Sequence, residues 1–340
     1  MLKMIGSVSM RPPRTGISLM LFVLFCAAIA QAQLFVTACH DDEQIAANKK
    51  AAFDSAAMQF FNTLISSDPA SAYDQLAVDA QKNLTREQIV GISKSVLQPM
   101  KVEHLRVDHT YDATFAGSKD GRVVCGTLSD NKWVSVVARS GEQAHVLLSA
   151  DFINGRFAFQ AWLVPDGGKW KIEGFWLGAS SLADYDAEKL WALARSEAAK
   201  KHRFNATVLH AVALQLSNRG PYLQLGLSSA ISQDAASFSP PPEITGQPPY
   251  EWKDGLSVYR ILNVGPIAVA GKVYIMIDHD ASPWTSNKEA DDWNKNLRAY
   301  FKRTFPEYRD VFSSVIIRAH EHGTTRGFGT VEQDTETEVK

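Results

Sequence analysis

The chemically active side chains of this chain gather most densely near its C-terminal end. Two segments typical of buried strands end in polar clusters at residues 278–280 (Asp-His-Asp) and 318–322 (Arg-Ala-His-Glu-His). A helical segment lies between them, so we expect a crossover with parallel strands whose carboxyl ends meet at one sheet edge. Imidazoles and carboxylates together suit zinc or a similar divalent ion. The candidate ligands are His279, Asp280, His320 and His322.

A simpler interpretation of this cluster needs no metal. Strand ends are wet, polar residues gather there, and the chain has no recognised zinc-binding spacing such as His-Glu-x-x-His. We therefore favour a solvated sheet edge and predict no resident cofactor. A metal-dependent enzyme that uses a divalent ion at the four residues is the alternative function.

A second group of titratable side chains lies on predicted strands in the first half of the chain. A pocket in a curved sheet could use such groups for proton transfer. Strict alternation along the strand would place neighbouring residues 108 and 109 on opposite faces, and exposed positions around an aromatic core are the simpler interpretation. The candidate pocket residues are Asp108, His109, Tyr111 and His145, with Glu173 on a later strand.

Established catalytic motifs are missing from the sequence. There is no glycine-rich phosphate loop and no Gly-x-Ser-x-Gly segment that would present a hydrolase serine. Residues 327–329 (Gly-Phe-Gly) are interpreted as a turn after the last strand. We therefore assign no catalytic residue and lean against an enzyme.

The N-terminal segment predicts export. Residues 1–16 carry three basic side chains and no acid, residues 17–30 are apolar apart from one serine, and Ala30 and Ala32 are small residues two positions apart. A basic start, an apolar stretch and such a pair form a secretory signal peptide. We expect a signal peptide over residues 1–32 and a protein of the periplasm or cell envelope, or a secreted one.

Three processing outcomes are open. Signal peptidase could cut after Ala32, or residues 36–39 (Val-Thr-Ala-Cys) could act as a lipobox with lipid attached to Cys39. Alternatively, residues 17–39 are long enough to remain as an uncleaved membrane anchor. Cys39 and Cys125 could form a disulfide only if Cys39 is not lipidated, and three cysteines in 340 residues do not make a disulfide scaffold.

The composition of the chain limits the kinds of partner that we expect. A formal charge of −2 argues against bulk attraction to nucleic acid or to anionic lipid. No segment after the N-terminal one is apolar enough to cross a membrane, so we expect membrane contact only through the signal, anchor or lipid. With 45% hydrophobic residues the chain can form substantial cores.

The first half of the chain predicts helices followed by a meander of strands. A polar tether covers residues 33–50, and helical spacing follows at 51–66, from Asp68-Pro69 to about 80, and at 85–97, which opens with a capping-box pattern. Strands are predicted at 102–116, 121–128, 131–139, 143–153, 156–164 and 169–177. Helices followed by antiparallel strands indicate the α+β class.

Two stretches carry a resemblance to a known superfamily. Residues 60–64 with 70–76, and the hairpin at 166–172 (Asp-Gly-Gly-Lys-Trp-Lys-Ile), resemble the opening helices and the last hairpin of nuclear-transport-factor-like, ketosteroid-isomerase-like domains. The resemblance covers residues 51–178 and implies a cone-like curved sheet. Because members include enzymes, ligand binders and interaction modules, it implies a fold and no particular activity.

The second half predicts three further parts. Residues 184–235 read as a helical hairpin whose second helix stops at Arg219-Gly-Pro221, and residues 236–249 as a proline-rich linker. Residues 250–330 predict a small α/β unit, and residues 331–340 an acidic, disordered tail.

The leading functional hypothesis is an exported, non-catalytic binding or interaction protein. It would bind an envelope protein partner or a small apolar ligand through the cone or the helical hairpin. A cone-domain enzyme of isomerase or dehydratase type is a further, weaker option. The hypothesis rests on the lack of an assembled catalytic set in the sequence.

Overall fold

The computed structural model describes residues 37–128 and 131–331. It contains helices and mostly antiparallel sheets, none of them closed, which confirms the predicted α+β class. The predicted signal peptide, the first residues of the tether and nearly all of the acidic tail lie outside the described residues. Within the described part, no helix has the length and apolarity that a membrane span needs.

The N-terminal helices form where their apolar spacing predicts them. The longest, α2, is amphipathic, and its buried side chains recur at helical spacing: Phe53, Ala57, Phe60, Phe61 and Leu64. Thr85 and Gln88 close the predicted capping box at the start of α4. The bounds are η1 Asp42–Gln44, α2 Ala47–Ile65, η2 Pro69–Gln75, α3 Val78–Asn83, α4 Arg86–Ile92, a π-helical turn Ser93–Leu97 and α5 Gln98–Met100.

The end of the predicted tether is ordered structure. Ala38–Asp41 forms strand β1, which pairs with Tyr111–Thr114 of the next strand, and α2 begins at Ala47. Polar composition suggested a flexible segment, but strand pairing and the helix satisfy this backbone. The tether prediction for residues 38–50 is therefore wrong.

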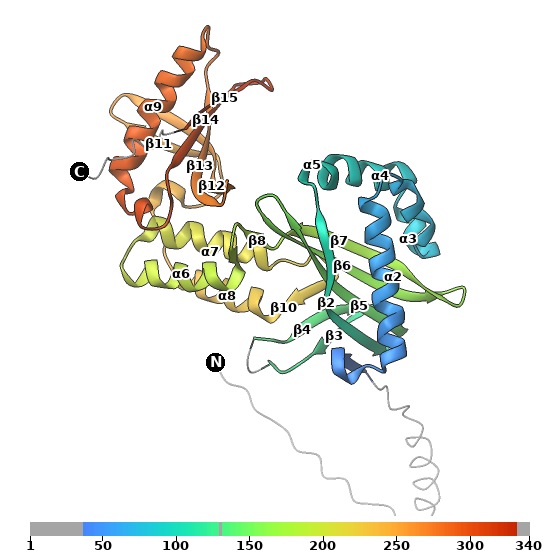
Figure 1. The fold of residues 1–340 in the computed structure, drawn as a ribbon. Helices are drawn as coiled ribbons and strands as arrows, with labels where there is room; N and C mark the ends of the chain where they lie inside the picture. Colours follow the sequence, from blue (N-terminus) through green and yellow to red (C-terminus); the bar gives the residue numbers. More distant parts are fainter. Residues whose placement is uncertain (1–36, 129–130, 332–340) are drawn as a thin grey trace, which may run out of the picture. The chain divides into compact units, whose positions relative to one another are not determined.

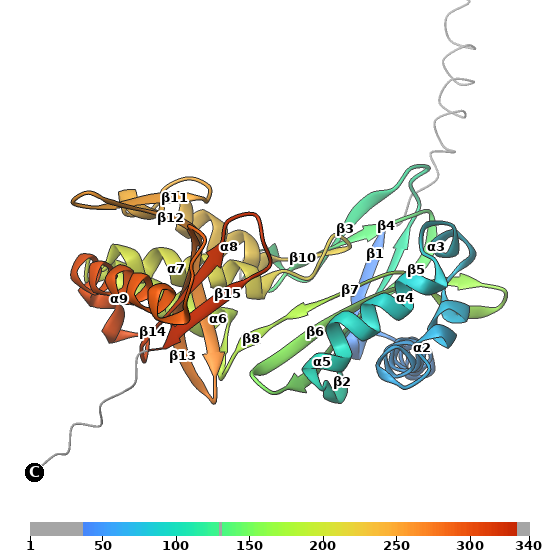
Figure 2. The same cartoon turned by 90° about the horizontal axis from the view of Figure 1, so that it is seen from above.

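A five-stranded antiparallel sheet, here called the main sheet, supports α2 on one face. Its order is β1-β2-β5-β6-β7, with bounds Ala38–Asp41, Glu103–Phe115, Gly141–Phe152, Gly155–Asp166 and Lys169–Ala179. Figure 2 looks along the axis of α2 and shows the helix beside these strands. Alternate residues of β5 from Ala144 to Ala150 are buried beneath the helices, while His145 and Leu147 between them point to the other face.

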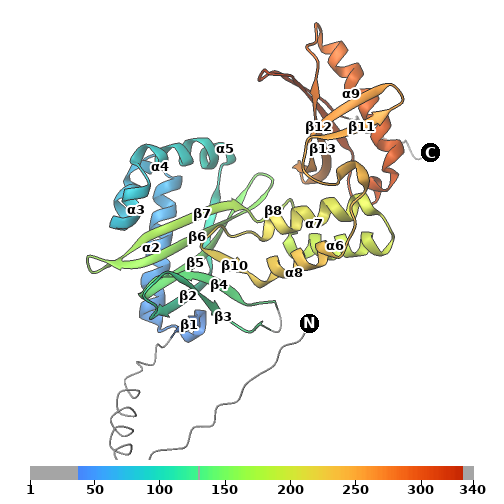
Figure 3. The same ribbon diagram turned by 180° about the vertical axis from the view of Figure 1, so that it is seen from behind.

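A three-stranded sheet, here called the small sheet, covers part of that other face. It consists of β3 Gly121–Cys125, β4 Val134–Ala138 and β10 Leu223–Leu225 in the order β10-β4-β3. Sequence reasoning placed β3 and β4 in one meander and ended the domain at 178. Instead the chain returns after two helices to add β10 to β4 (Figure 3).

The register of the main sheet shifts at three places, between Glu103 and Arg106 of β2, at Asp108 and at Glu173. Val107 and His109 pair with the consecutive residues Leu148 and Leu147, so Asp108 is the extra residue of β2. On β7, Ile172 and Gly174 pair with the consecutive residues Leu163 and Trp162, so Glu173 is the extra residue there. A bulge changes the direction of the side chain at the extra residue. At Asp108 and at Glu173 that side chain is a carboxylate.

The helical hairpin and the C-terminal sheet share one hydrophobic core. Phe204 of α7 stacks against Phe305 at 4.5 Å and contacts Phe301 of α9 edge-on. The helices are α6 Ala187–Ala199, α7 Arg203–Ser217, α8 Gly226–Ala236 and α9 Asn287–Thr304, and the strands are β11 Tyr250–Asp254, β12 Ser257–Val269, β13 Lys272–Ala281, β14 Val315–Glu321 and β15 Gly327–Val331 (Figure 1). The segments predicted as separate parts therefore pack together.

The predicted crossover in this sheet is confirmed. The strands β13 and β14 run parallel, and the chain passes from one to the other through α9. Leu297 and Phe301 of this helix are buried in the shared core. The predicted turn at residues 327–329 is wrong, because these residues begin β15, which pairs antiparallel with β14. Pairing with an existing sheet edge outweighs the low strand propensity of glycine.

A disulfide joins Cys39 of β1 to Cys125 of β3, with the Cα atoms 5.3 Å apart. It connects the edge of the main sheet to the small sheet across 86 positions of sequence. A sulfur atom in this bond cannot also carry a lipid. The pairing and the predicted lipid attachment at Cys39 are therefore mutually exclusive.

Candidate functional site

A cavity of about 840 Å³ opens on the face of the main sheet that α2 does not cover. Its floor includes residues of β2, β5 and β6, and its wall comes from the small sheet and the segment around β10. We call it the sheet-face cavity. Its apolar lining includes Tyr111, Trp133, Leu147, Ala158 and Leu225, and its polar lining includes Asp42, Asp108, His109, Ser149, Arg156 and Arg219.

Three of the four predicted pocket residues line this cavity. Asp108 and His109 both border it, because the bulge removes the alternation that would separate them. They do not form a dyad with each other. Asp108 accepts a hydrogen bond from the Ser149 hydroxyl at 2.8 Å, and His109 Nδ1 lies 2.9 Å from Asp42 Oδ2.

Tyr111 and His145 are not the exposed residues that the simpler interpretation expects. Burial raises the pKa of Tyr111, the third cavity residue, with Asp42 and Asp41 adding to the shift. His145 is fully buried outside the cavity lining. Its Nε2 donates to the Val137 carbonyl at 2.8 Å, and its Nδ1 accepts from Gln160 at 3.1 Å. With both nitrogens bonded, His145 stays neutral, and burial lowers its pKa to about 3.

Arg219 is the residue of this cavity that sequence reasoning missed. It lies in the turn between α7 and β10. Gly220 follows it with φ +81°, and a Cβ there would lie 2.3 Å from the Trp176 ring, so both the backbone and the packing require glycine. In the sequence it reads only as part of a helix stop. The return of β10 to the main domain brings its guanidinium to the cavity, and no local pattern signals that return.

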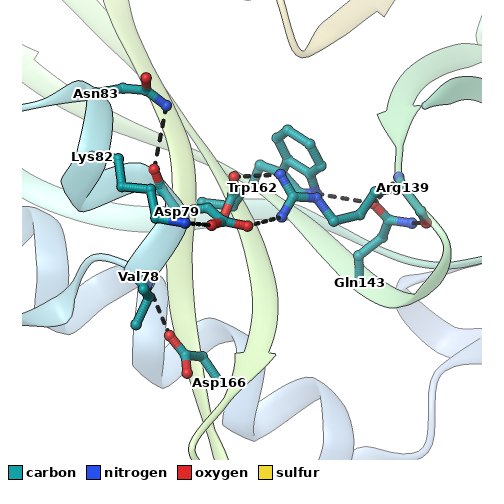
Figure 4. Close-up of polar contacts among 9 residues, drawn as sticks. Val78, Asp79, Lys82, Asn83, Arg139, Gln143, Trp162 and Asp166 are labelled. Atoms are coloured by element: carbon teal, nitrogen blue, oxygen red, sulfur yellow. Dashed lines mark hydrogen bonds and ion pairs between the residues drawn. The ribbon is translucent and has the colours of Figure 1, made fainter. Parts of the chain in front are cut away.

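A second arginine forms a closed structure on the same sheet face. Arg139, in the turn between β4 and β5, donates to Glu173 at the β7 bulge and to Asp79 of α3 at 3.3 Å. Its guanidinium lies 5.0 Å from the Trp162 ring centre (Figure 4). We call Arg139, Asp79 and Glu173 the arginine bridge.

The arginine bridge seals a polar layer beneath it. Trp162 Nε1 donates to Gln143 Oε1 at 3.0 Å, and Gln143 exchanges two hydrogen bonds with the backbone of Arg139. The Glu173 side chain is only 7% exposed, and its Oε2 has no partner among the described residues. Burial raises the pKa of Glu173, although Arg139 works in the opposite direction. These contacts join helix, main sheet and small sheet, which is a structural role.

The predicted metal ligands of the C-terminal sheet do not all converge. His279 faces α9, where its Nε2 lies 2.8 Å from Asn294 Oδ1, and burial lowers its pKa. Asp280 and His320 are a register pair on the opposite face, and His322 Nδ1 lies 2.9 Å from Asp280. Alternation along β13 causes this split, so at most three of the four could hold one ion.

A different trio has metal-compatible spacing within the part of the chain that the structure describes. Donor atoms of Glu197, His202 and Asp310 all lie within 4.8 Å of one another. Glu197 is fully buried, however, and already accepts hydrogen bonds from Lys200 at 2.7 Å and from Asn205 and His202, each at 2.8 Å. Burial alone would raise the pKa of Glu197, but these donors lower it. The trio therefore reads as an ion-pair cluster that joins α6 and α7 to the segment after α9.

Known proteins add no further information on this site. In comparisons with protein families, curated sequences and solved structures, no match to this chain was found. The argument for function therefore depends on the geometry of the residues themselves.

Proposed function

We propose that this protein is an exported, non-catalytic binding protein whose sheet-face cavity holds a small, largely apolar ligand. The observation that carries the proposal is a cavity of about 840 Å³ whose lining combines polar groups with the apolar side chains of Trp133, Leu147 and Leu225. Small-molecule sites are typically concave and apolar, with a few fixed polar groups, in a volume of roughly 300–1,000 Å³. The arginine bridge is saturated by its own partners and offers no comparable space.

The resemblance to cone-like domains agrees with this proposal. Helices cover one face of the antiparallel main sheet, and the cavity lies on the other face, where such domains would enclose a pocket. Two polar residues of the cavity already have partners. His109 lies within hydrogen-bond distance of Asp42, and Asp108 accepts a hydrogen bond from Ser149. Within this set no histidine contacts a serine hydroxyl, and the Ser149 hydroxyl contacts only the Asp108 carboxylate, so binding is favoured over catalysis.

Export is part of the proposal and has its own support. Structural disulfides persist in oxidising compartments outside the cytoplasm, and the Cys39–Cys125 pair is well placed for one. We favour signal cleavage before Cys39 without lipidation. An intact-mass measurement of the mature protein from its host would show a mass two hydrogens below the reduced chain; an acyl adduct on Cys39 would contradict it.

Filling the cavity tests the binding function. Ala158 lines the cavity and is 5% exposed, so Ala158→Trp should occupy the space without adding charge. We expect wild-type protein to enhance the fluorescence of the neutral probe N-phenyl-1-naphthylamine saturably, and Ala158→Trp to lose most of that signal. Leu256→Trp, at an exposed turn far along the sequence, is the matched control. Equal signals from wild type and Ala158→Trp would overturn the proposal.

A further inference from the structure

The guanidinium of Arg219 has unused hydrogen-bond donors. Its Nη1 donates to the carbonyls of Leu216 at 2.7 Å and Asn218 at 2.8 Å, near the end of α7. Arginine has five N–H donors in a planar fork. The Nε and Nη2 donors of Arg219 have no partner within the described residues, and the residue is only partly exposed. We call the Nε and Nη2 side of the guanidinium its free edge. Arginine commonly binds a carboxylate through such an edge with two parallel hydrogen bonds.

The charge of Arg219 is not balanced by an ion pair. Within residues 37–128 and 131–331 no carboxylate lies within 4.0 Å of its guanidinium nitrogens, although Asp108 borders the same cavity and favours the charged form. Burial lowers the pKa of Arg219 to about 10. A partly buried cation without an anionic partner is less well solvated than an exposed one, so a bound anion would gain more there than at a fully exposed arginine.

The other charged residues of the cavity limit the charge that a bound anion can carry. Five carboxylates line the cavity, those of Asp41, Asp42, Asp108, Asp186 and Glu188, together with the cations of Lys132, Arg156 and Arg219. Asp42 is occupied by His109, by the Thr110 amide at 3.1 Å and by Lys50 at 3.6 Å, Asp108 holds the Ser149 hydroxyl, and Asp186 lies 3.8 Å from Arg156. These carboxylates do not neutralise Arg219, but they repel added negative charge. A carboxylate with one charge therefore fits better than a phosphate with nearly two.

We propose that the ligand of the sheet-face cavity is a monocarboxylate, bound by the free edge of Arg219 with its apolar body against Trp133 and Leu147. This inference rests on the proposed binding function and adds the chemical class of the ligand. Arg219 acts as the specificity residue, because a neutral analogue of equal shape would leave the guanidinium unpaired.

Two probes of nearly equal shape test the inference. Octanoate and octanamide differ in charge at one end, and calorimetric titration measures the affinity of each for the full mature protein. We expect wild-type protein to bind octanoate at least about tenfold more tightly than octanamide, which corresponds to one charge-assisted contact. In Arg219→Gln the affinities should become equal, with octanamide binding retained as evidence that the variant folds.

Arg303→Gln is the matched control. Arg303 lies on α9 and is not part of the cavity lining, and its Nη2 donates to Asp254 at 2.9 Å. This variant should keep the preference for octanoate. Equal affinities in wild type, or a preference that survives Arg219→Gln, would overturn the carboxylate inference and leave the binding function standing. Failure of both probes to bind wild-type protein would overturn the binding function and the inference together.

Discussion

Arg139 and Arg219 both lie near a carboxylate that a β-bulge carries, yet only Arg139 makes an ion pair. At the arginine bridge, Glu173 and Asp79 contact the guanidinium, and the Trp162 ring lies beside it. At the sheet-face cavity, Asp108 bonds Ser149 instead, and Arg219 keeps an open edge. The same residue types thus produce one closed region and one open region on the same sheet face.

The difference between Arg139 and Arg219 shows how a charged residue that stabilises the fold can be distinguished from one that is available to bind a ligand. A buried ion pair whose members satisfy each other joins parts of a fold and leaves nothing for a ligand. An arginine that lines a cavity without an anionic partner has an unmet interaction, and unmet polar interactions mark functional sites more often than filled ones. The predictions below test whether the two regions differ in this way, from the largest expected effect to the smallest.

Loss of the disulfide should have the largest effect. Cys125 lines the sheet-face cavity, and its bond to Cys39 closes a loop of 86 positions. Replacing both cysteines by alanine should lower the free energy of unfolding by about 4 kcal/mol, because the unfolded chain regains the entropy of that loop. Urea unfolding measures the change. A loss no larger than that of a surface alanine substitution would mean that the bond does not form in the native protein.

Breaking the arginine bridge should cost nearly as much. Arg139→Met leaves the Glu173 carboxylate buried without its cation, and we expect a loss of about 3 kcal/mol in the free energy of unfolding at pH 7. Arg139→Met combined with Glu173→Gln should recover part of that loss, since the double variant has no unpaired buried charge. If the single variant unfolds like wild type, the closed region is not a structural brace.

The buried His145, whose ring stacks on Trp162, should make the stability of the protein depend on pH. The pKa of His145 is about 3 in the folded protein and near 6.5 when exposed, so the unfolded chain binds one more proton between these values. Stability should therefore fall as pH drops below about 6.5, by about 1.4 kcal/mol per pH unit from this group.

A glutamine at position 145 removes that contribution. His145→Gln should show a shallower loss of stability between pH 6 and pH 4 than wild type, measured by urea unfolding at each pH. His104→Gln is the control for replacing a histidine by glutamine, because His104 is exposed on β2. Parallel slopes for wild type and His145→Gln would show that the residue is accessible to protons in the native state.

Arg219→Met should have the smallest effect on the protein without ligand. The variant loses two hydrogen bonds to the end of α7 but also removes an unpaired charge, so the free energy of unfolding should change by no more than about 1 kcal/mol. Urea unfolding beside Arg139→Met gives the comparison directly. A loss as large as that of Arg139→Met would place Arg219 among the structural residues.

Much of the fold follows from local sequence patterns. The strands β2, β5, β6 and β7 of the main sheet lie within a few residues of their predicted limits, because alternation and turn residues such as Gly167 are strong local signals. The short edge strand β1 was not predicted. The capping box at Thr85 and the parallel pair β13–β14 also follow from local pattern and chain order. Each of these features depends on neighbours in sequence.

The candidate site depends on features that no local pattern encodes. A bulge at Asp108 or Glu173 is one unpaired residue that shifts the alternation by one position. On β7 this puts Ile172 and Phe175 in the same core, and a shift of one position among mixed residue types is too weak a signal to locate in advance. The pairing of β10 with β4 joins segments about 90 positions apart and brings Arg219 to the cavity. The split of His279 from Asp280 follows from alternation and could have been predicted.

The indole signals of the tryptophans offer the most direct test of the central claim, that the sheet-face cavity is a ligand site. Trp133 lines the cavity, whereas Trp252 is buried in the core of the C-terminal sheet. In a titration of ¹⁵N-labelled protein with octanoate followed by NMR, the account predicts a saturable shift of the Trp133 indole signal and an unmoved Trp252 signal. An unmoved Trp133 signal while another tryptophan shifts saturably would contradict it.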